Sequence, residues 1–190
     1  MFKLKFDTKT IAGLGILSAL VIALQILSNY VTFGPVSITL ALTPVVVGAC
    51  LYGPLGGLFL GVLQGILILT APSTAFFFNF SPFGTIITCL LKNGLAGFIA
   101  GVIFKSMEKK APKIGSIIAA VSAPIVNTGV FSIFACTLFF PIVEPLAGGE
   151  NFVIFYLTGF IGINFIIELV ANSVLSPVVY QTYKAVEKRN

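Results

Sequence analysis

Two ionisable side chains, Lys92 and Glu168, stand inside long apolar runs of this 190-residue sequence. A charge in a hydrocarbon environment is costly, so such groups usually pair with each other or serve a function. Counted at the helical rise, Lys92 lies about 14 Å and Glu168 about 24 Å from the outer ends of their runs. Two interpretations stay open: a structural Lys92–Glu168 ion pair, or contact between Lys92 and an anionic ligand.

Neutral polar side chains accompany these charges. Helical spacing puts them on shared faces: Thr85, Thr88 and Lys92 on one, and Asn164, Glu168 and Asn172 on another. Converging amides with one amine and aromatic rings would suit a small polar ligand, and a single lysine suits a carboxylate. The same amides could instead only hold helices together, at roughly 0.5–2 kcal/mol each. We predict Lys92 as an electrostatic anchor, hydrogen bonds from Asn127, Asn164 and Asn79, and Gln64 and Glu168 as further candidates.

The residue types that catalysis and metal binding usually need are scarce. The chain has no histidine and only six scattered acidic residues. Most metal sites and acid–base systems draw on histidine or clustered carboxylates. No P-loop sequence for ATP hydrolysis occurs either. The sequence therefore predicts a protein that is not an enzyme and that holds no metal ion or cofactor.

The composition indicates a membrane protein. Hydrophobic residues make up 57% of the chain and charged residues 9%, where a soluble domain carries about 25% charged residues. A soluble globule of this size cannot bury that much apolar surface. The length fits one domain, residues 1–190.

Apolar runs then define the elements that position the polar residues. We expect an all-α bundle of six transmembrane helices, since a spanning helix needs roughly 20 apolar residues. The expected helices are Thr10–Leu27, Ile38–Tyr52 closed by Gly53-Pro54, Leu55–Ala71 closed by Pro72, Phe83–Phe104, Ile114–Phe140 and Phe152–Tyr180. Two of these runs are short for a full crossing.

Basic residues predict the orientation of this bundle. Ten of the eleven lie in three places: the two chain ends and the connector that follows the fourth helix. They are Lys3, Lys5 and Lys9; Lys105, Lys109, Lys110 and Lys113; and Lys184, Lys188 and Arg189. With six spans all three places fall on one side, so both termini are expected in the cytoplasm. The net charge of +5 is thus a topology signal and not a nucleic-acid patch.

Small residues recur every four positions on three of the helices. Gly53, Gly57, Gly61 and Gly65 form one stripe, and Gly97 and Gly101 form another. Such stripes let helices approach closely, and we expect these two to pack internally. On the first helix, Gly15, Ala19 and Ala23 share a smooth face that fits either an internal seam or contact with a partner membrane protein.

An aromatic segment, AFFFNFSP at 75–82, falls between the third and fourth helices on the side opposite the lysines. Free water is a poor environment for so many rings. The segment either folds back over the membrane face or caps a cavity, or else it is an interfacial aromatic anchor.

The order of these features resembles the substrate-binding S components of energy-coupling factor (ECF) vitamin transporters over nearly the whole chain. The resemblance rests on Val36–Pro44 through Gly48, on the YGPLGG segment Tyr52–Gly57 with Gly61, and on Leu91–Gly97. Gly15, Ala19 and Ala23 match the small-residue motif by which the family's first helix contacts the coupling subunit. The resemblance therefore favours a partner interface over an internal seam on that helix.

This resemblance implies a multi-pass subunit of a prokaryotic plasma membrane that captures a vitamin from outside. Its implied partners are a transmembrane coupling subunit and two ATPase subunits, which together form an ABC importer. The chain looks most like the pantothenate-type subunits, and Lys92 would suit the carboxylate of pantothenate. Other vitamins, such as hydroxymethylpyrimidine or pyridoxine, riboflavin and folate, stay open, as does a structural or assembly protein without a ligand.

Overall fold

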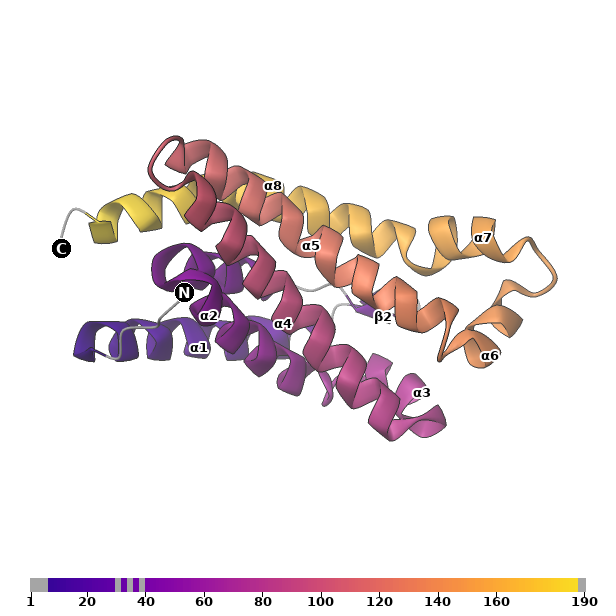
Figure 1. Ribbon diagram of the computed structural model, residues 1–190. Helices are drawn as coiled ribbons and strands as arrows, with labels where there is room; N and C mark the ends of the chain where they lie inside the picture. The colour runs from indigo at the N-terminus through magenta and orange to yellow at the C-terminus, as the bar shows by residue number, and fades with distance from the viewer. Residues whose placement is uncertain (1–6, 30–31, 34–35, 38–39, 188–190) are drawn as a thin grey trace.

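The computed structural model describes residues 7–29, 32–33, 36–37 and 40–187, and they form a bundle of helices (Figure 1). Within these residues, five helices are long and apolar enough to cross a membrane: α1 (Thr8–Ser28), α2 (Leu42–Ile68), α4 (Pro82–Met107), α5 (Pro112–Cys136) and α8 (Gly162–Glu187). Lys3, Lys5, Lys188 and Arg189 lie outside the described residues, as do parts of the connection between the first and second expected helices.

Short elements connect the long helices. They are the antiparallel pair β1 (Thr32–Phe33) and β2 (Val36–Ser37), α3 (Pro72–Phe80), α6 (Phe140–Val143), the 3₁₀ turn η1 (Glu144–Ala147), α7 (Phe152–Phe155) and the π-helical turn η2 (Tyr156–Phe160). In the fifth and sixth expected spans, the continuous helix is therefore shorter than the apolar run that predicted it. The fifth ends at Cys136 and not at Phe140, and the sixth is divided into α7, η2 and α8 around Ile161.

The second and third expected helices together form α2, within which the chain turns back sharply at Gly53. Gly53 has φ 76° and ψ −171°, a backbone conformation that glycine adopts without strain. Gly48 lies against Leu60, and Gly56 against Tyr52, so segments 42–52 and 54–68 fold back on one another. At 1.5 Å per residue they are about 16 and 22 Å long. Each segment alone is shorter than the hydrocarbon core, which is roughly 30 Å thick. By total length α2 therefore counts as one membrane-spanning helix, although its two segments run in different directions.

The glycine stripe of α2 packs against α4, as the sequence predicts. A Cβ on Gly57 would collide with the carbonyl oxygen of Gly97, and one on Gly61 with that of Asn93. Without side chains at these positions, the two backbones come into direct contact. This contact fixes the height of α4 relative to α2 and, with it, the position of Lys92.

The small-residue stripe of α1 faces away from the bundle. Leu14, Leu17 and Val21 are buried against the bundle, whereas Gly15, Ala19 and Ala23 are exposed. Nothing lies within 4 Å of a Cβ placed on Gly15. The stripe is therefore not a seam within the described part of this chain.

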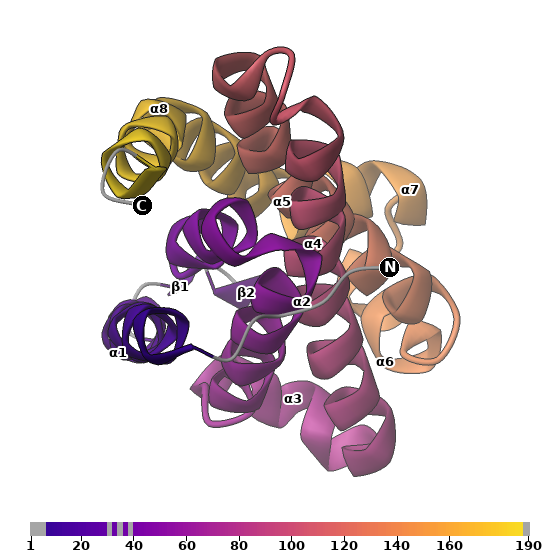
Figure 2. The same ribbon diagram turned by 60° about the vertical axis from the view of Figure 1, so that its left-hand side comes forward.

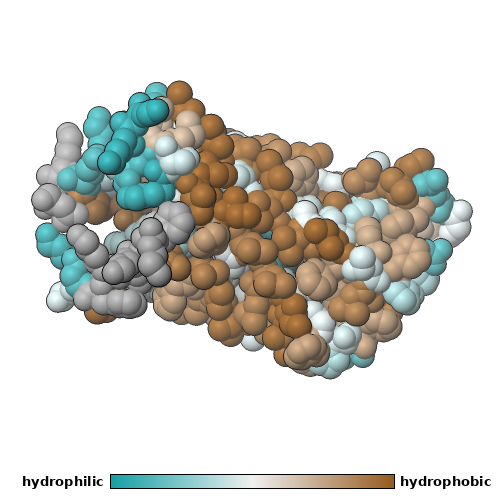
Figure 3. Space-filling model, viewed as in Figure 1, coloured by the Kyte–Doolittle hydropathy of each residue, from teal (hydrophilic) through white to brown (hydrophobic). Residues whose placement is uncertain are grey.

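The ends of the molecule differ in character. The start of α1, the end of α8 and the α4–α5 connection lie at one end, and α3, α6 and α7 lie at the other (Figures 1 and 2). The space-filling view shows hydrophobic residues over the middle and hydrophilic ones gathered at the α4–α5 end (Figure 3). Exposed apolar side chains such as Ile16, Ile133 and Val174 contribute to the apolar surface. A surface of this kind suits a lipid environment.

Candidate functional site

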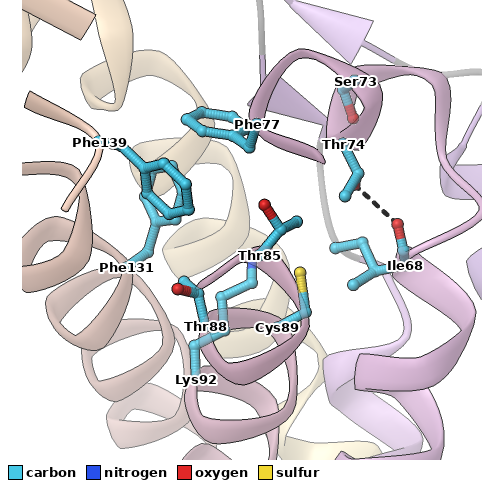
Figure 4. A pocket seen from close by; sticks show the side chains of 10 residues that line it. All are labelled: Ile68, Ser73, Thr74, Phe77, Thr85, Thr88, Cys89, Lys92, Phe131 and Phe139. Carbon is cyan, nitrogen blue, oxygen red and sulfur yellow. Dashed lines mark hydrogen bonds between the residues drawn. The ribbon is translucent and has the colours of Figure 1, made fainter. Parts of the chain in front are cut away.

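A small cavity lies at the α3 end of the bundle, where α3 meets α4 and α5 (Figure 4). Its volume is about 40 Å³, which is room for no more than a few water molecules. The residues that line it are Ile68, Ser73, Thr74, Phe77, Thr85, Thr88, Cys89, Lys92, Phe131 and Phe139. They come from the end of α2, from α3, α4 and α5, and from the segment after α5.

Lys92 gives this cavity its charge. Its side chain is only 8% exposed, and its amine points from α4 into the cavity, toward Thr85 (Figure 4). Nζ lies 5.2 Å from the centroid of the Phe131 ring, a distance at which the ring face attracts a cation. At the opposite end of the bundle, an ion pair joins Lys105 to Glu108.

Three threonines place hydroxyl groups on the cavity wall. Thr85 donates to the carbonyl oxygen of Ser81 at 2.9 Å, and Thr88 to that of Gly84 at 2.7 Å. Thr74 donates to the carbonyl oxygen of Ile68 at 2.7 Å, which ties α3 to the end of α2. All three threonines are buried. The helical spacing of Thr85, Thr88 and Lys92 thus produces the shared face that the sequence predicts.

Aromatic rings close the cavity. The ring of Phe77 meets that of Phe139 edge-on at 5.1 Å between centroids, and that of Phe131 at 5.6 Å. Phe77 belongs to the aromatic segment, most of which lies in α3, and its ring lines the cavity, as the cavity-capping interpretation of this segment expects. Phe131 and Phe139 were not predicted, because only the packing of α3 against the end of α5 brings them here.

Two of the predicted binding amides take part in contacts between helices. Asn127 Nδ2 donates to Oδ1 of Asn93 at 2.8 Å, from α5 to α4. Gln64 Nε2 donates to Oε1 of Gln25 at 3.4 Å, from α2 to α1. Both predicted residues are buried, and neither belongs to the cavity lining. These contacts correspond to the helix-joining role that the sequence left open.

The remaining predicted residues lie apart from the cavity wall. Glu168 and Asn164 are buried on α8, and Asn79 is exposed on α3. The candidates that the sequence offers include Asn164 and Glu168 of the last apolar run, but no described residue of α8 lines this cavity. Its walls come instead from α2, α3, α4, α5 and the segment after α5, because α3 packs over the start of α4.

The apolar bundle indicates a multi-pass membrane protein, and its buried, lysine-bearing cavity is the candidate site for a small polar molecule. A family model for the substrate-specific component of ECF transporters matches residues 9–180. The chain therefore belongs to the ECF transporter substrate-specific component family. The match spans α1 through most of α8 and so includes every residue of the cavity. A search of curated proteins found no match to the chain.

Proposed function

We propose that this chain is the pantothenate-binding subunit of an ECF-type ABC importer. Its family supports a substrate-specific transporter subunit for a vitamin-type ligand. The observation that carries the choice of vitamin is Lys92, a buried ammonium aimed into a cavity. A buried cation favours a ligand with a negative charge, since pairing offsets the desolvation of both groups. Pantothenate carries one carboxylate, together with hydroxyl groups and an amide.

In this proposal Lys92 holds the carboxylate, and the rings of Phe77, Phe131 and Phe139 pack against the apolar part of the ligand. A cavity of about 40 Å³ is too small for a vitamin, so binding requires α3 to move away from the end of α5. The contacts of Phe77 would break and re-form around the ligand. No bond of the ligand is made or broken, so the proposed role is transport without catalysis.

The predicted amides and Glu168 take different roles. Asn127 is joined to Asn93, the neighbour of Lys92, and we propose that it orients α4 behind the site. Asn79 on the outer side of α3 would reach the ligand only after α3 moves. Asn164 and Glu168 on α8, and Gln64 on α2, stay predicted ligand contacts for the opened site.

The proposed partners are a transmembrane coupling subunit and two ATPases. The exposed stripe of Gly15, Ala19 and Ala23 supports a contact on α1, because it offers a smooth surface that another helix can approach closely. The energy for uptake would come from ATP hydrolysis by the partners.

The proposed topology has six crossings in a prokaryotic plasma membrane, with both termini in the cytoplasm. The reversal at Gly53 supports it, since the two segments of α2 then count as separate crossings. The shared location of the α1 start, the α8 end and the lysine-bearing α4–α5 connection supports it as well (Figure 1). A cytoplasm-active reporter fused to the C terminus should be active, and an inactive one would contradict the topology.

A thermal-shift screen of the purified chain against water-soluble vitamins tests the proposal. A ligand at 100 times its Kd should stabilise the fold by about 2.7 kcal/mol if it binds only the folded state. A shift with pantothenate alone is expected. A shift with pyridoxine, riboflavin or folate instead would keep the transporter class and overturn the choice of vitamin. A chain that no vitamin stabilises would favour a structural membrane protein without a ligand.

A further inference from the structure

The threonine hydroxyl groups of the cavity already use their hydrogens. Those of Thr74, Thr85 and Thr88 each donate to a main-chain carbonyl at 2.7–2.9 Å. A hydroxyl group has one hydrogen to donate and two lone pairs that accept. In a buried site a hydrogen bond to a carbonyl is kept, since breaking it without replacement leaves a desolvated polar group. These three oxygens therefore face the cavity as acceptors.

The charged group beside them has the opposite property. The ammonium of Lys92 has three donors and no acceptor. A lysine side chain on a helix leans toward the N-terminal turn, and Figure 4 shows the amine of Lys92 reaching toward Thr85. One cavity thus combines a cationic donor with hydroxyl acceptors, closed by the faces and edges of phenylalanine rings.

We propose that Thr85 and Thr88 are specificity-determining residues that accept hydrogen bonds from the ligand. The site then selects an anion that also carries hydroxyl or amide N–H donors, and it disfavours an anion whose other polar atoms only accept. This inference rests on the proposed function, because it concerns the same cavity. The charge of Lys92 requires only that the ligand is an anion. Thr85 and Thr88 add the requirement that the ligand also donates hydrogen bonds.

The test compares pantothenate with a deoxyfluoro analogue, in which fluorine replaces a hydroxyl group. Fluorine is close to hydroxyl in size but cannot donate. The wild-type chain should bind pantothenate more tightly than at least one of the two monofluoro analogues, on the order of tenfold for one lost hydrogen bond. In Thr85→Val or Thr88→Val the ratio of the affinities for pantothenate and the analogue should fall toward one, because valine keeps the shape of threonine and removes the acceptor oxygen. Thr85→Ser and Thr88→Ser should restore it.

A matched control is Thr182→Val, near the end of α8 that is proposed to lie on the cytoplasmic side. Thr182 makes the same type of bond, to the carbonyl oxygen of Val178 at 2.8 Å, but is not part of the cavity. This variant should keep the wild-type preference. A purely structural role for Thr85 and Thr88 would weaken both ligands equally and leave their ratio unchanged, which would overturn the inference. Equal wild-type binding of pantothenate and both analogues would overturn it too, while leaving the proposed function intact.

A failure of the proposed function has a different signature. If the folded wild-type chain does not bind pantothenate but binds another vitamin, the choice of vitamin fails. The inference then survives only if that vitamin is an anion with hydrogen-bond donors. If the folded chain binds none of the vitamins, the proposed function and the inference that rests on it both fail.

Discussion

Asn127 on α5 donates a 2.8 Å hydrogen bond to the side-chain oxygen of Asn93 on α4, and Asn93 directly follows Lys92. The amide of Asn93 in turn donates to the carbonyl oxygen of Cys89 at 2.8 Å. One turn of α4, from a cavity-lining cysteine to the cavity-lining lysine, is thereby connected to α5. This arrangement links the stability of the bundle to the position of the buried charge.

Replacing Asn127 by leucine should destabilise the chain by about 1–2 kcal/mol, because the buried Oδ1 of Asn93 loses its donor. Thermal unfolding in detergent measures this change. Asn79→Ala is the control, since Asn79 is exposed on α3 and its loss should leave the unfolding temperature unchanged. A variant of Asn127 as stable as the wild type would show that the bond does not join α4 and α5 energetically.

The contact between α2 and α4 should be sensitive to a single methyl group. In Gly61→Ala the new Cβ would meet the main chain of Asn93 and lie about 3.0 Å from the Cα of Gly94. Overpacking of this kind costs about 1–3 kcal/mol. Gly129→Ala on α5 is the matched control, because nothing lies within 4 Å of its Cβ position. Equal stability of the two variants would contradict the close approach of α2 and α4.

Cys89 allows the closure of the cavity to be measured. Its thiol lines the cavity and is buried, Cys50 is buried elsewhere, and Cys136 is exposed. In a Cys136→Ser background, a membrane-permeant maleimide should label Cys89 slowly, and pantothenate should slow labelling further.

The variant Phe77→Ala should accelerate this labelling, because it removes the ring that packs against Phe131 and Phe139. Phe83→Ala is the control, as Phe83 is 75% exposed and lies outside the cavity lining. Labelling of Cys89 at the same rate with and without Phe77 would argue against α3 as the cover of the site.

The α1 interface can be tested with a bulky ring. Ala19→Trp should leave folding and ligand binding intact, since Ala19 is exposed, and should prevent co-purification with the coupling subunit. Ile133→Trp is the control, because Ile133 on α5 is likewise exposed, at 64%. If the Ala19 variant still assembles while the control behaves as expected, the coupling subunit binds another face.

Much of the fold can be predicted because apolar runs and prolines mark the helices directly. The Gly53-Pro54 break, the lysine-bearing connector and the Lys92 face of α4 all follow from local spacing. The division of the last apolar run at η2 could not be predicted, since the sequence there stays apolar while the hydrogen-bonding pattern changes. Hydrophobicity alone does not distinguish a π-helical turn from an α-helix.

The site was predicted less well than the helices. Thr85, Thr88 and Lys92 are neighbours on one helix, so their spacing reveals the shared face. Phe131 and Phe139 are distant in sequence, and only tertiary packing places them beside Phe77. The amides were expected to point at a ligand, but buried amides also satisfy one another between helices, as Asn127 and Gln64 do. Spacing does not distinguish these two uses.

The most direct test of the account measures the charge of Lys92 against the charge of the ligand. Titration calorimetry would compare pantothenate with pantothenol, in which an alcohol replaces the carboxylate. The wild-type chain should prefer pantothenate, and Lys92→Met should lose about 10- to 100-fold in affinity for it, as expected for a charge-assisted hydrogen bond. Its affinity for pantothenol should change little. Lys105→Met, which removes a charge at the opposite end, should match the wild type. An unchanged preference for pantothenate in folded Lys92→Met would contradict the account.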